Sequence, residues 1–172
     1  MNTKLSHFDS RTGRAKMVDV GDKKAAVRVA IAKSVLSVSR DLAAILKKGT
    51  LEKGDAFTVA KTAGLLAAKQ TGQIIPMCHP LPVEYIDIDI WLEEDPCLIF
   101  IQAEVRTTAK TGVEMEALTA ASVTGLTLYD MCKAVDKSII IQKTGLYKKT
   151  GGKSGVYINS AMEEIGRKPI TP

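Results

Sequence analysis

Apolar residues recur at close to helical spacing over residues 23–48, and this pattern predicts a long helix there. Gly49 follows it and suits a C-terminal cap, because glycine enters the left-handed backbone region without a steric penalty. A second helix is predicted over residues 56–70, with Asp55 as its N-terminal cap and Gly72 as its end.

Strict alternation marks a different kind of element further along the chain. Residues 83–92 contain the run I-D-I-D-I, which predicts a strand with one face toward water. Residues 93–96 form a predicted turn and residues 97–106 the returning strand, so the two strands make a hairpin. Shorter β-rich runs predict one strand over residues 15–20 and another over residues 138–142.

The most informative stretch is residues 114–135, an apolar helical pattern with ionisable residues at both ends. Glu114 and Glu116 open it, and Asp130 and Lys133 close it. The pattern predicts a largely buried helix, and buried ionisable groups are costly unless they have partners or a function.

These elements follow the order strand, two helices, hairpin, helix, strand. This β-α-β-β-α-β outline with an extra helix predicts an α+β fold in which helices pack on one face of an antiparallel sheet. A length of 172 residues suits a single domain with a sizeable core. Residues 1–13 and 160–172 are predicted to be flexible ends of that domain.

Composition narrows the function classes. The net charge of +5 suits nucleic acid or a small, highly phosphorylated ligand, but an aromatic content of 5% disfavours stacking on single-stranded bases. Three cysteines without a C-x-x-C pair predict free thiols and a reducing cytoplasm. The sequence has no run of roughly 18 apolar residues that would predict a membrane helix, and its polar N-terminus disfavours a signal peptide.

A histidine between two prolines is the first candidate for chemistry. In P-M-C-H-P the prolines hold His79 in a stiff, extended segment, which suits a side chain that must keep its orientation. A structural turn explains the motif equally well. Metal binding by Cys78 and His79 is disfavoured, because neighbouring residues of an extended chain point to opposite sides.

Each end of the third predicted helix has a structural and a functional interpretation. At its start, Glu114 and Glu116 interact favourably with the helix dipole, while Gly112 beside them allows a ligand to approach closely. At its end, Asp130 and Lys133 lie three residues apart. They form either a surface ion pair or, if half buried, an acid–base pair with tuned proton affinity.

Further basic candidates depend on where the fold places them. Lys53 stands just before Asp55 and is either a solvated loop lysine or a ligand contact. Residues 148–155 form a Gly- and Lys-rich segment that departs from the Walker A pattern; it is either a flexible basic loop or a phosphate-binding loop. Arg28 and Arg40, on the first predicted helix, are candidates for phosphate contacts.

A distance argument constrains the site. Glu116 and Asp130 are 14 residues apart, which corresponds to about 21 Å along one helix. Either the ligand is long, or an antiparallel pairing of this helix across a two-fold axis brings Glu116 of one chain near Asp130 of another. The small residues Ala120, Ala121 and Gly125 would allow such close approach.

Six motifs carry a resemblance to a known family. The chain contains, in this order, M-V-D-V, K-G-D, M-C-H-P-L, T-G-V-E-M-E-A-L-T-A-A-S-V, L-Y-D-M-C-K-A-V and G-G-K-S-G. Over residues 8–157 it resembles the MoaC-type cyclic pyranopterin monophosphate synthases of molybdenum-cofactor biosynthesis.

The resemblance implies a ferredoxin-like α+β fold and a homohexamer, a trimer of dimers with active sites at the dimer interface. It implies a cytoplasmic lyase that converts 3′,8-cyclo-7,8-dihydroguanosine 5′-triphosphate to cyclic pyranopterin monophosphate and releases pyrophosphate. By matched position it implies catalytic roles for Asp130, Lys53 and Lys133. It also implies substrate-binding or supporting roles for Met77, Cys78, His79, Met115, Glu116, Glu114, Lys149 and Arg28.

The residue types suit that chemistry. Opening and reclosing a purine ring needs several proton transfers, which paired acids and bases provide, and basic side chains stabilise a departing pyrophosphate. No redox cofactor is expected; Mg²⁺ could accompany the pyrophosphate, although the sequence shows no dedicated metal site. Two other classes stay open: a non-catalytic purine-nucleotide-binding protein on the same scaffold, and a nucleic-acid-binding module, which the few aromatic residues disfavour.

Overall fold

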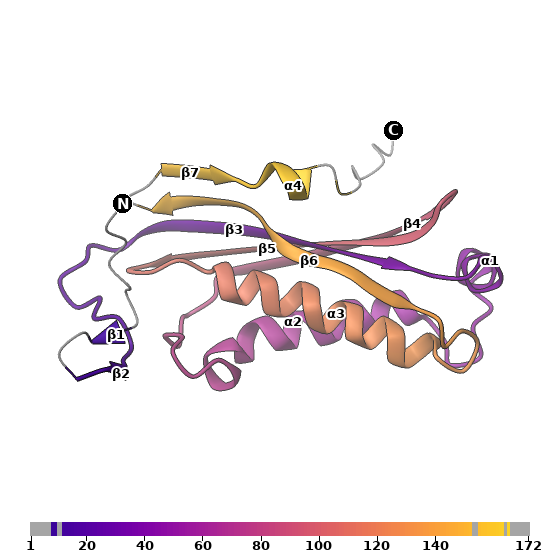
Figure 1. Cartoon of the computed structure of the whole chain (residues 1–172), viewed down its shortest axis with the longest axis horizontal. Helices are drawn as coiled ribbons and strands as arrows, with labels where there is room; N and C mark the ends of the chain where they lie inside the picture. The colour runs from indigo at the N-terminus through magenta and orange to yellow at the C-terminus, as the bar shows by residue number, and fades with distance from the viewer. Residues whose placement is uncertain (1–7, 10–11, 153–154, 164, 166–172) are drawn as a thin grey trace.

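The computed structural model describes residues 8–9, 12–152, 155–163 and 165, and its centre is a five-stranded antiparallel sheet with strand order β4-β5-β3-β6-β7 (Figure 1). These strands are β3 (Ala26–Ser37), β4 (Tyr85–Glu94), β5 (Cys97–Ala109), β6 (Ile140–Gly152) and β7 (Gly155–Ile158). The helices of the described chain are α1 (Arg40–Lys48), α2 (Ala56–Ile74), α3 (Glu114–Cys132) and α4 (Ser160–Glu163). A separate two-stranded sheet pairs β1 (Phe8–Asp9) with β2 (Arg14–Ala15).

The long helices α2 and α3 lie side by side across one face of the large sheet (Figure 1). The main hydrophobic core fills the space between, and it includes Leu36, Ile88 and Ile101 of three adjacent strands, none more than 1% exposed. At Gly64 the two helices are so close that a Cβ atom would lie 2.2 Å from Thr124 Oγ1. This arrangement confirms the predicted α+β fold, and the strand order is compatible with a ferredoxin-like topology.

The predicted helix over residues 23–48 is wrong in its first half. Residues 26–37 form β3, which pairs with β5 on one side and β6 on the other, and only residues 40–48 are helical. The physical reason is that a central strand buried on both faces carries a nearly continuous apolar run, which periodicity alone does not distinguish from a buried helix. Residues 32–36 are all buried.

Two other strand predictions also need correction. Residues 16–20 contain no strand, since β2 ends at Ala15. The strand predicted over residues 138–142 runs instead from Ile140 to Gly152. It therefore includes residues 148–152, most of the Gly- and Lys-rich segment that was expected to be a loop.

Asp55 and Gly49 cap their helices as predicted, but Gly72 does not end α2. The side chain of Asp55 accepts two backbone N–H groups of the first turn of α2, at 3.0 and 3.1 Å, and Gly49 ends α1 with a φ of 64°. The helix α2 continues two residues past Gly72. Gly72 lets the following segment pack closely, since a Cβ atom there would lie 3.1 Å from Pro80 Cα.

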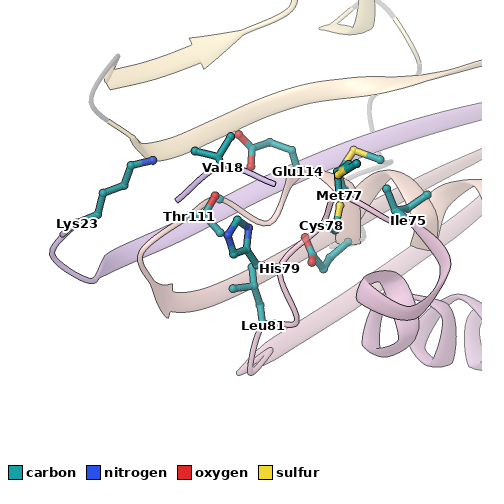
Figure 2. A pocket seen from close by; sticks show the side chains of 12 residues that line it. Val18, Lys23, Ile75, Met77, Cys78, His79, Leu81, Thr111 and Glu114 are labelled. Carbon is teal, nitrogen blue, oxygen red and sulfur yellow. The ribbon is translucent and has the colours of Figure 1, made fainter. Parts of the chain in front are cut away.

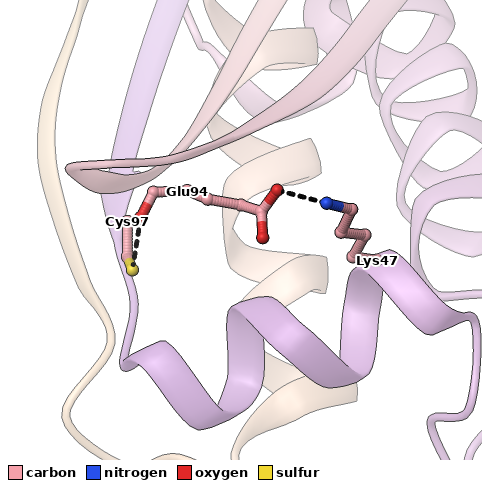
Figure 3. A network of polar contacts seen from close by, with 3 residues as sticks. All are labelled: Lys47, Glu94 and Cys97. Carbon is pink, nitrogen blue, oxygen red and sulfur yellow. Dashed lines mark hydrogen bonds and ion pairs between the residues drawn. The ribbon is translucent and has the colours of Figure 1, made fainter.

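The predicted hairpin is confirmed as β4 and β5, and its tip is attached to α1. Lys47 of α1 donates a hydrogen bond to Glu94 at 2.6 Å, and the Cys97 thiol donates to the Glu94 carbonyl at 3.0 Å (Figure 3). Both side chains of the Lys47–Glu94 pair are more than half exposed, so the ion pair contributes little to stability.

The opposite face of the sheet is covered in part by the C-terminal residues. Met162 of α4 is 2% exposed and packs with Val35 and Phe100, while Lys33 donates to the Ile165 carbonyl at 3.0 Å. Within the C-terminal segment that the sequence predicts to be flexible, residues 160–163 form α4. Most of the flexible ends predicted at residues 1–13 and 160–172 lie outside the described residues. None of the helices in the described part of the chain is both long and apolar enough to span a membrane.

Candidate functional site

A cavity of about 410 Å³ lies at the N-terminal end of α3 (Figure 2). The irregular segment after α2 supplies Met77, Cys78 and His79, and the start of α3 supplies the acidic side chains. The full lining is Val18, Lys23, Ile75, Met77, Cys78, His79, Leu81, Thr111, Gly112, Glu114, Met115 and Glu116. Six of these were site residues implied by the sequence resemblance, and the fold brings them to one place.

Burial controls proton affinity in this cavity. Glu116 is only 3% exposed, and burial raises the pKa of its carboxyl group, with a smaller contribution from the charge of Glu114. Burial also raises the pKa of the Cys78 thiol, and the charges of Glu116 and Glu114 add to this effect. Burial thus shifts Glu116 and Cys78 toward their protonated forms, which are the forms that can donate a proton to a ligand.

A second cavity of about 700 Å³ adjoins the first and is strongly basic. The two cavities share Lys23, Thr111, Gly112 and Glu114. The second is lined by Asp22, Lys23, Lys24, Ala26, Arg28, Lys110, Thr111, Gly112, Glu114, Lys149, Gly151 and Gly152. Five cationic side chains against two carboxylates make a site for a polyanion such as a chain of phosphates.

Two of the predicted basic residues are held in place within this second cavity. Lys149 of β6 pairs with Glu114 at 2.9 Å, and both side chains are about two-thirds buried. Arg28 donates from Nε to the Ala109 carbonyl at 3.3 Å and from its guanidinium to the Gly151 carbonyl. Arg28 therefore lies on β3 and joins the ends of β5 and β6, instead of projecting from a helix as predicted.

The three residues implied to be catalytic meet at the other end of α3. Lys133 contacts Asp130 at 2.7 Å, and the Lys53 ammonium lies 4.0 Å from the Asp130 carboxylate. Lys53 also donates a hydrogen bond to the Asp130 main-chain carbonyl at 3.0 Å. Its positive charge thus lies at the C-terminal end of α3, where the helix dipole favours a cation.

These three side chains are exposed, unlike Glu116. Between 44% and 62% of each remains accessible to water. The hydrogen bond from Lys133 lowers the pKa of Asp130, as do the charges of Lys133 and Lys53, and the same bond raises the pKa of Lys133. The cluster therefore holds a carboxylate between two ammonium groups.

Within one chain, the side chains at the N-terminal end of α3 lie far from those at its C-terminal end. Both lie on the continuous helix α3, so the separation of about 21 Å between Glu116 and Asp130 holds. Of the predicted residues, the N-terminal end of α3 collects Met77, Cys78, His79, Glu114, Met115, Glu116, Lys149 and Arg28, and the C-terminal end collects Lys53, Asp130 and Lys133.

Sequence reasoning missed three lysines, namely Lys23, Lys24 and Lys110, which line the second cavity. Lys110 directly precedes the T-G-V-E-M-E motif, and this position was the available signal. The Gly- and Lys-rich segment is a strand up to Gly152, where it is part of β6, and Lys149, Gly151 and Gly152 line the second cavity. Its residues 153 and 154 lie outside the described residues. Arg40 lies apart from both cavities, in a groove beside the hairpin tip.

No cluster of three or more potential metal-binding side chains (His, Cys, Asp or Glu) occurs within the part of the chain that the structure describes.

Known proteins resemble this chain over most of its length. The model of the MoaC family matches residues 17–152. A cyclic pyranopterin monophosphate synthase of Brevibacillus brevis is 54% identical over 155 residues, which are 90% of this chain and 96% of that protein. A synthase of the same name from Bacillus thuringiensis subsp. konkukian is 52% identical over 89% of this chain and 96% of its own length. One from Bacillus cereus is 51% identical over 91% of this chain and 98% of its own length. By this family match and these identities, the chain belongs to the MoaC family.

Proposed function

We propose that this chain is a cyclic pyranopterin monophosphate synthase, a phosphorus–oxygen lyase of molybdenum-cofactor biosynthesis. Its substrate would be 3′,8-cyclo-7,8-dihydroguanosine 5′-triphosphate, and pyrophosphate would leave. The observation that carries the proposal is the 54% identity to a curated synthase over 90% of this chain. The pair of adjoining cavities supports it, since one has the size of a small ring system and the other is basic.

The cavities suggest how the substrate binds. We place the purine-derived rings against Met77, Cys78 and His79, where buried acids can donate protons. The triphosphate then lies in the basic cavity, where Lys149 and Lys110 stabilise the charge that develops on the leaving pyrophosphate. This reaction involves no net oxidation or reduction, so it calls for no redox cofactor.

The remaining proton transfers require the cluster at the other end of α3. Asp130, with Lys53 and Lys133 on either side, has the paired acid and base that ring opening and reclosure need. We propose that this cluster comes from a second copy of the chain, with α3 helices antiparallel across a two-fold axis. The small residues Ala120, Ala121 and Gly125, expected at this interface, are instead buried within the chain. Exposed apolar residues on the outer surface of α3, Met115, Leu126 and Tyr129, suit the interface.

A trimer of such dimers would give the hexamer that the family resemblance implies. We place the reaction in the cytoplasm, because Cys78, Cys97 and Cys132 are all free thiols.

The direct test is to incubate the purified protein with the cyclised guanosine triphosphate and measure pyrophosphate and the cyclic monophosphate. Stoichiometric release of both products is expected. Tight binding without release of either product would contradict the proposal and indicate the non-catalytic nucleotide-binding protein instead.

A mixing experiment tests the two-chain site. Glu116→Gln and Asp130→Asn should each inactivate the protein, and co-expression of the two variants should restore roughly a quarter of the wild-type activity. That fraction follows because half of randomly formed dimers pair the two variants and carry one intact site of two. Co-expression of either variant with itself is the control. No recovery, with mixed dimers verified by differently tagged chains, would contradict a shared site.

A further inference from the structure

Unlike α1, the helix α3 does not end at a left-handed glycine cap. In α1, Gly49 takes the left-handed conformation and its N–H binds the carbonyls of Ile45 and Leu46. In α3 the C-cap is Lys133 in a right-handed conformation, and the N–H groups of the next turn, at Val135 and Asp136, both donate to the Cys132 carbonyl. Another interaction must therefore fix the direction in which the chain leaves α3.

The side chain of Asp136 supplies that interaction. It is 7% exposed, and it accepts the main-chain N–H of Ser39 at 2.7 Å. It also accepts the N–H of Ser138 at 2.8 Å and the hydroxyl of Ser138 at 2.6 Å. Ser39 is the N-cap of α1, and its own hydroxyl accepts the N–H of Leu42. One carboxylate thus joins the end of α3, the start of α1 and the approach to β6.

These are the elements that present the proposed catalytic side chains. Asp130 and Lys133 lie at the end of α3, and Lys53 lies between α1 and α2. All three are about half exposed, so their relative positions depend on the backbone that carries them more than on packing around them. Misplacement of a reacting group by about 1 Å can cost roughly 100-fold in rate.

We propose that Asp136 is a positioning residue for the proposed reaction, holding Lys53, Asp130 and Lys133 in register by joining the end of α3 to the start of α1. This proposal rests on the proposed function of that cluster. Asp136 acts through the main chain of Ser39 and through the main chain and hydroxyl of Ser138; these hydrogen bonds do not involve the three proposed catalytic side chains.

The charge of Asp136 fits this role. The hydrogen bond from the Ser138 hydroxyl, with those from the main chain of Ser39 and Ser138, lowers the pKa of Asp136 to about 2. The carboxylate is therefore ionised at any pH at which the protein would work. Its field and that of Lys53 both reach Cys132, where Asp136 raises the thiol pKa and Lys53 lowers it. Burial is the largest cause of the Cys132 pKa of about 11.

The test compares Asp136→Asn with the wild type. The amide keeps the size of the side chain but loses its charge and one of its acceptor oxygens. We expect kcat to fall roughly 10- to 100-fold while KM changes less than about threefold, because the substrate cavity at the other end of α3 is untouched. Kinetics are measured well below the unfolding temperature, with the folded fraction checked by circular dichroism.

A second readout does not depend on turnover. Carbon-13 NMR titration of the Asp130 carboxyl reports its contact with Lys133 and Lys53, which lower its pKa from the ordinary 3.8. In Asp136→Asn we expect this pKa to move up toward the ordinary value. An unchanged Asp130 pKa together with an unchanged kcat would overturn the proposal. A wild-type protein that releases no pyrophosphate would instead count against the proposed function, and the NMR result would still decide the positioning role.

Two further variants separate positioning from general stability. Glu94→Gln removes the exposed pair with Lys47 at the opposite end of α1 (Figure 3) and should leave kcat and the Asp130 pKa unchanged. Ser138→Ala removes one of the three hydrogen bonds and should lower kcat less than Asp136→Asn does. Because both changes act on one contact, the double variant should be no worse than Asp136→Asn alone. Additive losses would contradict the proposed mechanism.

Discussion

The two ends of α3 handle charge in opposite ways. At the N-terminal end, Glu116 is 3% exposed and burial raises the pKa of its carboxyl group. At the C-terminal end, the Asp130 side chain is 62% exposed and cationic neighbours lower its pKa. One helix thus presents a carboxyl group that holds its proton readily and another that releases it readily.

This difference indicates a division of labour. In the proposed reaction, the buried Glu116 would donate protons to the bound ring, while the Asp130 carboxylate between two ammonium groups would exchange protons in a wetter setting. Because the two groups are about 21 Å apart on one continuous helix, the proposed reaction would need a pairing of chains to bring both ends together.

The largest expected effect comes from removing the charged cluster. Asp130→Asn should lower kcat by roughly 100- to 10,000-fold while the substrate still binds, because the variant loses an acid–base group and keeps both cavities. Glu116→Gln should lower kcat and also weaken binding, since its side chain lines the ring cavity. Steady-state kinetics and calorimetric binding of the substrate separate the two effects. Equal losses of binding in both variants would remove the distinction between the two ends.

A smaller effect is expected from disturbing the close packing of α2 against α3 at Gly64. In Gly64→Ala the new Cβ would lie 2.6 Å from Ile88 Cδ1 and 3.1 Å from the main-chain oxygen of Ala120. We expect a loss of about 1–3 kcal/mol in the free energy of unfolding, measured by urea titration.

Gly125→Ala is the matched control for that change. Its Cβ would meet no atom closer than 3.6 Å, and alanine favours a helix by about 0.5–1 kcal/mol over glycine. Gly125→Ala should therefore not destabilise the protein. Equal destabilisation by both variants would show that α2 and α3 are not packed as described.

The smallest expected effect is on the pH dependence of stability, to which two buried carboxyl groups, Glu116 and Asp136, contribute with opposite signs. The raised pKa of Glu116 means that its stabilising contribution is full below the ordinary value of 4.5 and is lost as pH rises through the folded-state value. Asp136, with its pKa near 2, contributes on the order of 2 kcal/mol above its ordinary value of 3.8. That contribution is lost as pH falls through about 2.

Urea unfolding between pH 2 and 8, followed by the fluorescence of Trp91, measures both contributions in the protein and in its amide variants. Relative to the wild type, Glu116→Gln should gain stability as pH rises, and Asp136→Asn should lose it. The same sign for both variants would contradict the assigned environments.

Local chemistry made part of this fold predictable. Asp55 and Gly49 cap their helices because a side-chain acceptor and a left-handed glycine act on their immediate neighbours. The alternation of the hairpin was equally readable. The strand β3 was not, because its burial on both faces arises from strands and helices distant in sequence.

The site was predictable to a similar extent. The family motifs identified the side chains at both ends of α3, and helix geometry gave their separation. The structural contacts of Arg28 were not readable, since they depend on strand ends that meet it only in the folded sheet. Nor were Lys23 and Lys24, because nothing in their local sequence distinguishes them from other surface lysines. Lys110 had one signal, its position directly before the T-G-V-E-M-E motif.

The ion pair between Lys149 and Glu114 affects which anions can bind in the basic cavity. An arriving anion must replace the carboxylate at Lys149, in a setting where both partners are about two-thirds buried. A singly charged anion gains little from this exchange, since it substitutes one charge for another. A ligand with several charges also reaches Lys23, Lys110 and the other cations around the cavity. In the proposed function, this exchange would favour a triphosphate over singly charged anions.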